Sequence, residues 1–165
     1  MTPDPRIKTP LSAAIIAAVL LLIGACAGEG GADMTEDEAL ERVEQHIDNA
    51  ITHMTPQPRP KPRRRLDIPC ADSHGRDTGL YQVERRYWLD DIPTDKNQQI
   101  FDTLHTYWTD QNYEITEDVR DRHLARALTA EFEGFHVRVL ERDDGRLSIR
   151  ATSPCIETSE SPNDT

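Results

Sequence analysis

The sequence lacks the short motifs that mark the common enzyme classes. It contains no G-x-S-x-G nucleophile elbow, no H-E-x-x-H zinc motif, no Walker loop and no glycine-rich dinucleotide fingerprint. Three of its six histidines, His46, His53 and His105, fall on predicted helices without a second metal ligand one turn away. We therefore expect no catalytic residue, no metal and no cofactor, and a protein that is not an enzyme.

A surplus of positive charge is also missing. The 165 residues include 19 Lys and Arg against 30 Asp and Glu, which gives a formal net charge of −11. Proteins that bind nucleic acid usually present a strongly basic surface. We therefore expect no nucleic-acid partner.

No apolar run reaches the usual length of a permanent membrane anchor. Residues 11–25 are free of charge and follow the basic residues Arg6 and Lys8. A membrane-spanning helix needs about 20 apolar residues, so this run is short for that role. A basic start followed by such a run is typical of a signal peptide, to which we assign residues 1–25.

The end of this run resembles the lipobox of bacterial lipoproteins, with Ile23, Gly24 and Ala25 before Cys26. In that family the chain is cut before the cysteine, whose thiol carries a diacylglycerol. The resemblance implies a lipid anchor on Cys26 at the extracytoplasmic face of the cell membrane, and two or more acyl chains hold a small domain there for long times. Cleavage after Ala27 would instead release a secreted protein, and an uncleaved anchor is a third alternative.

Cysteines are scarce, and their number is odd until Cys26 is assigned to lipid. The remaining two, Cys70 and Cys155, form a pair that we expect to be a disulfide in an oxidising compartment. Such a bond is worth roughly 4–5 kcal/mol on the chain-entropy model. The alternative, a metal site built on Cys70 and His74, lacks the second ligand pair of a zinc motif.

Residues 26–34 are glycine-rich and predict a flexible tether. An amphipathic helix is predicted over residues 35–54, because Thr35 and Glu38 match a capping box and apolar residues then recur at steps of three and four. The apolar stripe consists of Leu40, Val43, Ile47, Ile51 and Met54. This stripe either packs on the protein's own domain or serves self-association or docking on an envelope protein.

The segment 55–65 has proline at alternating positions and is the most basic stretch of the chain. Alternating prolines favour polyproline II, so we predict a semi-rigid linker. Its basic residues are Arg59, Lys61, Arg63, Arg64 and Arg65. They either offset the acidic helix in solvent or contact phospholipid headgroups or an anionic wall polymer.

A core domain is predicted over residues 66–155, followed by a disordered tail at 156–165. A first strand is predicted at 81–89, with Arg85 as the one misfit. Its two faces alternate between an apolar set, Tyr81, Val83, Tyr87 and Leu89, and an opposite set, Gln82, Glu84, Arg86 and Trp88. A helix is expected to begin at Pro93-Thr94 and to stop at Asn112 in a left-handed conformation. A second strand follows at 113–119.

The last third of the core predicts two successive hairpins. A two-residue turn at Glu133-Gly134 and a three-residue loop at 143–145 put the apolar residues of all three strands on one face. This register sets Arg138 directly opposite Arg150 on the other face, and His136 opposite Glu131. Like charges in direct opposition are mildly destabilising. In one interpretation, Glu131 or the acidic C-terminal tail neutralises the two arginines. In the other, Arg138, Arg150 and His136 contact an anion or a partner.

These elements predict the α+β class, with a largely antiparallel sheet of four or five strands and one helix packed on a face. An amphipathic helix and a proline-rich linker precede this core. The layout and the closing Ser153-Pro154-Cys155 resemble small envelope lipoproteins of actinobacteria of the LppA-like kind, a resemblance that implies no activity.

The predicted function is a cell-envelope lipoprotein that presents a binding or assembly domain. One alternative is a scaffold or oligomerisation subunit acting through residues 35–54. The other is a hydrolase or carrier for a small anionic envelope molecule.

Overall fold

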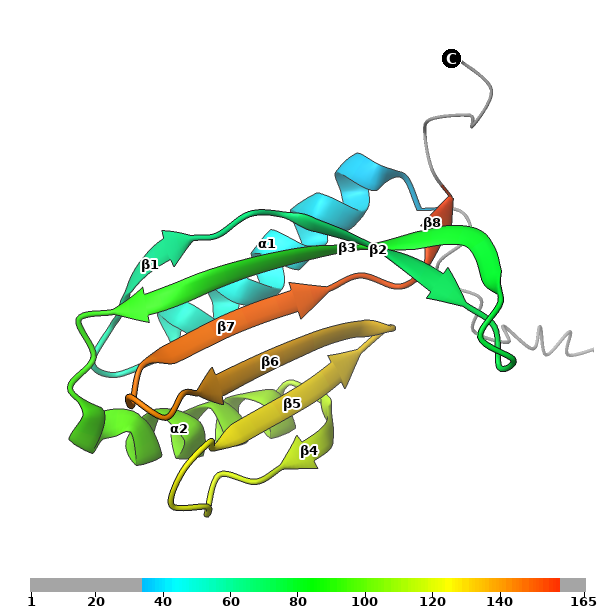
Figure 1. The fold of residues 1–165 in the computed structure, drawn as a ribbon. Coiled ribbons are helices and arrows are strands. Elements are labelled where there is room, and N and C mark those ends of the chain that lie inside the picture. Colours follow the sequence, from blue (N-terminus) through cyan, green and yellow to red (C-terminus); the bar gives the residue numbers. More distant parts are fainter. Residues whose placement is uncertain (1–33, 158–165) are drawn as a thin grey trace, which may run out of the picture.

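Residues 34–157 are described by the computed structural model, and they form one antiparallel sheet with two helices on one face (Figure 1). The elements are α1 (Glu36–Thr52), β1 (Arg59–Pro62), β2 (Leu66–Ala71), β3 (Asp77–Asp90), a 3-10 turn η1 (Thr94–Lys96), α2 (Asn97–Asp110), β4 (Glu114–Asp118), β5 (Ala127–Phe132), β6 (Phe135–Glu141), β7 (Leu147–Thr152) and β8 (Ile156–Glu157). The predicted α+β class is confirmed. Within the described range, neither helix is long and apolar enough to cross a membrane.

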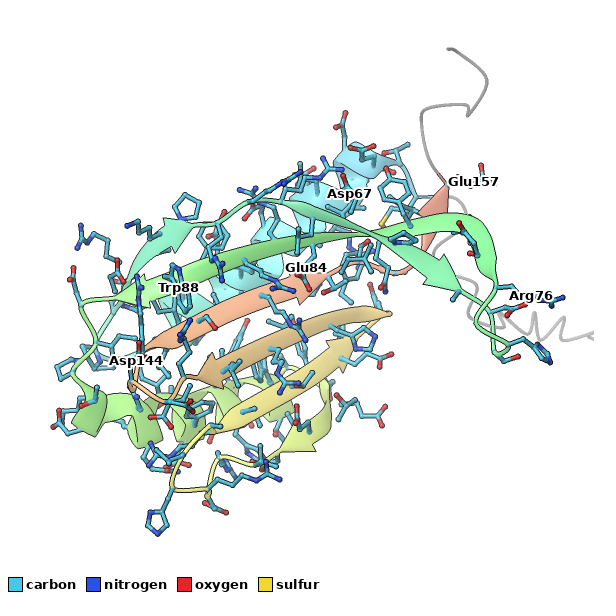
Figure 2. All side chains as sticks on the ribbon, viewed as in Figure 1. Asp67, Arg76, Glu84, Trp88, Asp144 and Glu157 are labelled. Atoms are coloured by element: carbon cyan, nitrogen blue, oxygen red, sulfur yellow. A yellow bond between two sulfur atoms is a disulfide. The ribbon has the colours of Figure 1, made fainter. Side chains whose placement is uncertain are left out.

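The sheet has the order β1-β3-β7-β6-β5-β4, and β2 and β8 pair with the first half of β3. Eight strands are therefore present where four or five were expected. The β2–β3 hairpin projects beyond the rest of the sheet, with Arg76 at its tip (Figure 2). Both helices lie behind the sheet in Figure 1, so that view shows the opposite face, here called the outer face.

Helix α1 begins with the predicted capping box. The Thr35 hydroxyl accepts a hydrogen bond from the Glu38 amide, and the Glu38 carboxylate accepts one from the Thr35 amide at 2.9 Å. Of the predicted stripe, Val43, Ile47 and Ile51 are buried against the inner face of the sheet.

The stripe therefore packs on the protein's own domain, the first of the two alternatives. Leu40 is half-buried at its edge, beside a second, smaller apolar cluster. Self-association through these residues would require α1 to leave the sheet.

Arg85, the misfit in the first predicted strand, lies on the inner face of β3. Its guanidinium forms an ion pair with Glu44 of α1 and lies 5.6 Å from the centre of the Tyr87 ring. The Tyr87 hydroxyl donates a hydrogen bond to the same carboxylate at 2.7 Å. Arg85 therefore breaks the apolar pattern of β3 because it makes a polar contact with helix α1.

The predicted linker at 55–65 requires a correction, because it contains strand β1. Residues 59–62 pair with the end of β3, from Arg59 opposite Asp90 to Pro62 opposite Tyr87. The dihedral angles of polyproline II and of a β-strand are close, and proline is tolerated in an edge strand, where its missing N–H faces no partner. Residues 59–62 therefore pair with an otherwise unpaired edge of β3 and become part of the sheet.

The domain boundaries change in the same way. The folded unit begins at α1 rather than at residue 66, and it includes β8, which pairs with Leu80 and Tyr81 of β3. The predicted disordered tail thus loses its first two residues to the sheet. The predicted signal peptide at 1–25, residues 26–33 of the predicted tether and residues 158–165 lie outside the described residues.

Both predicted hairpins are confirmed with their register. Phe132 pairs with Phe135 across the turn, and Val139 pairs with Ile149. Glu133 and Gly134 both have positive φ, as a tight hairpin turn requires, and Gly145 has a φ of 79° in the three-residue loop. The predicted left-handed residue after α2, Asn112, has a φ of 62°.

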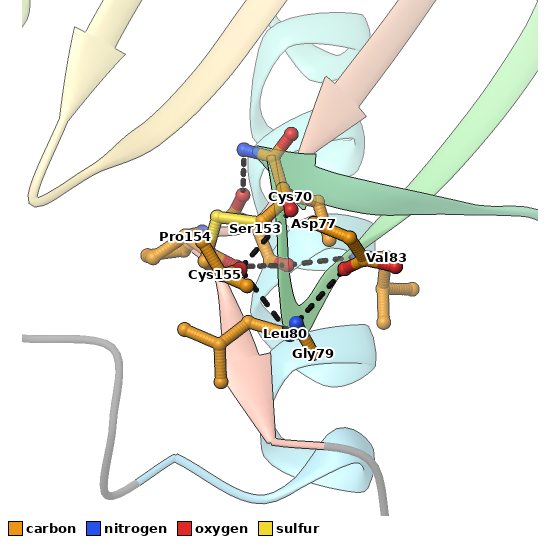
Figure 3. Close-up of a disulfide and its surroundings, with 10 residues drawn as sticks. Cys70, Asp77, Gly79, Leu80, Val83, Ser153, Pro154 and Cys155 are labelled. Carbon is orange, nitrogen blue, oxygen red and sulfur yellow. Dashed lines mark hydrogen bonds between the residues drawn. A yellow bond between two sulfur atoms is a disulfide. The ribbon is translucent and has the colours of Figure 1, made fainter. Parts of the chain in front are cut away.

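The predicted disulfide between Cys70 and Cys155 is present (Figure 3). It joins β2 to the segment between β7 and β8, across a sequence separation of 85 residues. Beside it, the Ser153 hydroxyl accepts a hydrogen bond from the Val83 amide at 2.9 Å. The bond fixes the C-terminal segment on β3, and it removes the Cys70 thiol from any metal site.

His46 is buried where α1 packs on the β5–β6 hairpin. Its side chain is 8% exposed, its Nδ1 lies 2.7 Å from the Tyr113 hydroxyl, and its ring centre lies 5.0 Å from that of Phe135. Burial lowers the pKa of His46 to about 4, and the nearby Arg42 lowers it further against the opposite effect of Glu133. The imidazole is therefore neutral at pH 7.

We expect this histidine to make the domain sensitive to mild acid. The unfolded chain takes up the proton near pH 6.5 and the folded chain near pH 4, so stability falls as the pH drops through this window. The full loss is about 3 kcal/mol. Urea unfolding of wild type and of His46→Gln at several pH values measures it. An identical pH dependence of the two proteins between pH 6.5 and 4 would contradict this assignment.

Candidate functional site

The outer face of the sheet carries charged side chains, whereas the helices cover the inner face. Strand alternation directs Glu84, Arg86 and Trp88 of β3 to the outer side, because their neighbours Val83 and Leu89 are buried in the core. Figure 2 shows Glu84 near the middle of the sheet and Trp88 closer to the C-terminal end of β3. The outer face is the part of the domain on which an anion can approach several cations at once.

Four arginines occupy directly neighbouring positions on this face. Arg86 of β3 pairs with Arg150 of β7, and Arg150 pairs with Arg138 of β6. Arg63 follows β1, and its amide donates a hydrogen bond to the Arg86 carbonyl at 2.9 Å. With strands about 4.8 Å apart, this arginine row extends for about 14 Å across the sheet.

Two carboxylates partly neutralise the row. Glu84 is only 1% exposed, and it forms ion pairs with Arg86 and, at 3.5 Å, with Arg150. Glu117 of β4 lies 2.6 Å from Arg138. Within residues 34–157, no carboxylate oxygen lies within 4.0 Å of the Arg63 guanidinium. Four positive charges therefore face two negative ones.

Trp88 adjoins the row and collects further guanidinium groups. The Cζ atoms of Arg63, Arg142 and Arg146 lie 4.8, 5.3 and 4.4 Å from the centre of its ring. Cation–π contacts of this kind hold a guanidinium in place without neutralising its charge. Arg146 also pairs with Asp90 at 2.7 Å.

These side chains surround an open hollow of about 410 Å³. No acidic residue contributes to its lining, which consists of Arg63, Arg86, Trp88, Arg138, Leu140, Arg142, Ser148, Ile149 and Arg150. Guanidinium groups present planar pairs of donors that match carboxylate and phosphate oxygens. The hollow therefore has the chemistry of an anion-binding site.

Arg150 shows the electrostatic strain of the row. Its pKa is lowered from the usual value of an arginine, mainly by partial burial of the guanidinium. The positive charges of Arg86 and Arg138 lower it further, against the opposite effect of Glu84. An anion bound beside Arg150 would relieve this repulsion.

The site agrees only in part with the residues predicted from the sequence. Arg138 and Arg150 oppose each other as predicted, and both line the hollow. His136 does not line it: this residue pairs with Glu131, whose carboxylate lies 3.6 Å from its Nδ1. Cys26, the predicted lipidation site, lies outside the described residues.

The sequence patterns assign no site role to Arg86, Trp88 and Arg142, and they suggest an anion contact for Arg63 only as one basic residue of the predicted linker. Arg86 and Trp88 were placed on the polar side of their strand, but the neighbouring strand was not known. Arg63 was placed in the linker. Within residues 34–157, no group of three or more His, Cys, Asp or Glu side chains is arranged to hold a metal ion.

Comparison of the chain with protein-family models, with curated proteins and with solved structures gives no significant match. The assignment of a function therefore depends on the geometry of the site and on the N-terminal sequence.

The row predicts opposite effects for two neighbouring arginines. We expect Arg86→Gln to lower the free energy of unfolding by about 2 kcal/mol, because the buried Glu84 loses its nearest partner. Arg150→Gln should leave stability within about 0.5 kcal/mol of wild type or raise it, because it removes a repelled and partly exposed charge. Urea unfolding of the two variants makes the comparison, and equal destabilisation would contradict this account.

Proposed function

We propose that the protein is a cell-envelope lipoprotein whose folded domain binds an anionic ligand on the outer face of its sheet. The observation that carries the binding role is the hollow lined by five arginines and no carboxylate. The lipobox-like residues 23–26 support the anchor. The domain is proposed to bind and not to catalyse.

The distribution of charge supports this role. A chain with a net charge of −11 nevertheless concentrates arginines on one face, where they repel one another. Such an arrangement costs stability unless something negative offsets it. Glu84 and Glu117 do so in part, and a ligand anion would complete the compensation.

The chemistry of the hollow supports binding rather than hydrolysis. Ser148 is the one hydroxyl side chain in the lining, and it donates a hydrogen bond to the Leu140 carbonyl at 3.5 Å. The lining contains no histidine and no carboxylate that would activate this hydroxyl as a nucleophile. The lining groups instead supply positive charge and hydrogen-bond donors.

The proposed anchor is tested by intact-mass spectrometry of the native protein. We expect a chain that begins at Cys26 and carries a diacylglyceryl mass, with the loss of two hydrogens for the disulfide between Cys70 and Cys155. A Cys26→Ser variant should lose the lipid and keep the disulfide. A mature chain that begins at Gly28 would overturn the anchor.

The proposed anion site is tested by the fluorescence of Trp88. The second tryptophan, Trp108, is fully buried, so ionic quenchers report mainly on Trp88 in the hollow. Relative to the effect of each ion on free N-acetyltryptophanamide, we expect iodide to quench this emission more strongly than caesium at equal ionic strength, because the arginines attract the anion and repel the cation.

Inorganic phosphate should compete with iodide and reduce its quenching of Trp88. The double variant Arg138→Gln and Arg150→Gln should also reduce the quenching by iodide. Arg76→Gln is the matched control, because Arg76 lies at the tip of the projecting hairpin (Figure 2). Equal quenching by iodide and caesium would argue against the site.

A further inference from the structure

The shape of the arginine row distinguishes between kinds of anion. The row extends for about 14 Å over four neighbouring strand positions. A single phosphate group makes charge-assisted hydrogen bonds at about 2.8 Å and contacts only neighbouring guanidinium groups. The backbone positions of Arg63 and Arg138 are three strands apart, so a ligand with several linked anionic groups fits the length of the row better than one small anion.

The unmatched charges also lie apart. Glu84 is closest to Arg86, and Glu117 pairs with Arg138 at the β4 side. The two least neutralised charges are those of Arg63 and Arg150. Among residues 34–157, Arg63 has no carboxylate within 4.0 Å, and Arg150 lies 3.5 Å from Glu84, which it shares with Arg86. Their backbone positions are two strands apart, and two positive charges are neutralised in full by two linked negative groups.

The positive track is open at one end. Strand β1 is an edge strand, and its Lys61 pairs with Trp88, which puts both side chains on the outer face next to the row. Arg59, two residues earlier, lies on the same side of β1, but its guanidinium is paired with Asp91 at 2.9 Å, so among the described residues the unpaired positive charge at this end is that of Lys61. At the opposite end, Glu117 ends the track with a negative charge. A ligand longer than the hollow can therefore extend over β1.

The aromatic content argues against a nucleic acid. Single-stranded nucleic acids are bound by aromatic side chains on which bases stack, in addition to a positive groove. Trp88 is the one aromatic side chain in the lining of the hollow, and three guanidinium groups lie over its ring. The site offers charge for a phosphate chain and no free platform for bases.

We infer, on the basis of the proposed anion site, that the ligand is a linear chain of repeated phosphate groups without bases, which lies across the strands along the arginine row. Its phosphates contact Arg150 and Arg63 at once, and its continuing end runs over β1 towards Lys61. Trp88 is a positioning residue, because it holds Arg63 and Arg142 at the rim of the hollow.

Calorimetric titration of the full-length protein in non-ionic detergent tests this inference. The probes are inorganic phosphate, a linear polyphosphate of about ten phosphates, which exceeds the length of the row, and oligothymidylate with the same number of phosphates. We expect the polyphosphate to bind at least about tenfold more tightly than phosphate, because its linked charges contact several arginines together. Oligothymidylate should bind more weakly than polyphosphate.

Salt dependence supplies a second measurement. Log K falls linearly with log salt, and each arginine that contacts the chain makes this slope steeper by about one unit or slightly less. Arg63→Gln and Arg150→Gln should therefore each make the slope shallower by about that amount. Arg76→Gln should leave it unchanged. Arg63 is exposed and lies outside the core, so its variant should fold, which circular dichroism checks.

The outcomes separate this inference from the proposed function. Equal affinity for phosphate and polyphosphate, with iodide quenching intact, would overturn the linear ligand and keep a site for a single anion. Tighter binding of oligothymidylate would overturn the exclusion of bases. Loss of both phosphate binding and preferential iodide quenching would overturn the anion site itself.

Discussion

The alternation of side chains along β3 is the constraint on which both faces of the domain depend. This strand runs for 14 residues and pairs with β1, β2, β7 and β8. Tyr87 and Leu89 face the helices, whereas Arg86 and Trp88 face outward. A slip of one residue would exchange the two sets and put a guanidinium into the core. The register that builds the core therefore also aligns the arginines.

Glu84 offsets part of the repulsion between the aligned arginines. A buried carboxylate is costly unless charges and hydrogen bonds satisfy it. Here Arg86 and Arg150 pair with its oxygens, and the Thr152 hydroxyl donates to it at 3.1 Å. Because its closest pairing is with Arg86, the remaining positive charge lies on either side of that residue. The buried carboxylate thus determines where the outer face can accept an anion.

Local patterns predicted the parts of the fold that local chemistry determines. The turn at 133–134 and the loop at 143–145 have residues suited to positive φ, and the period of two between them left one register, which brought Arg138 opposite Arg150. The disulfide followed from the pairing of the two cysteines beyond Cys26.

Non-local pairing could not be predicted in this way. Whether the proline-rich segment is a spacer or a strand depends on the free edge of β3, which lies far away in the sequence. Arg63 was therefore separated from the other arginines. Arg86 was recognised as outward-facing, but the pairing of β3 with β7 was unknown. His136 and Arg138 both face outward on β6, but His136 lies two residues from Arg138 and pairs with Glu131.

The fold also changes how far the domain can lie from its proposed anchor. Helix α1 and residues 59–62 belong to the folded unit, so the proposed tether from Cys26 ends at Thr35 and not at residue 65. At no more than about 3.4 Å per residue, this segment spans at most about 30 Å. A domain anchored through Cys26 therefore works close to the membrane surface, and a linear ligand bound along the arginine row must be reachable within that distance.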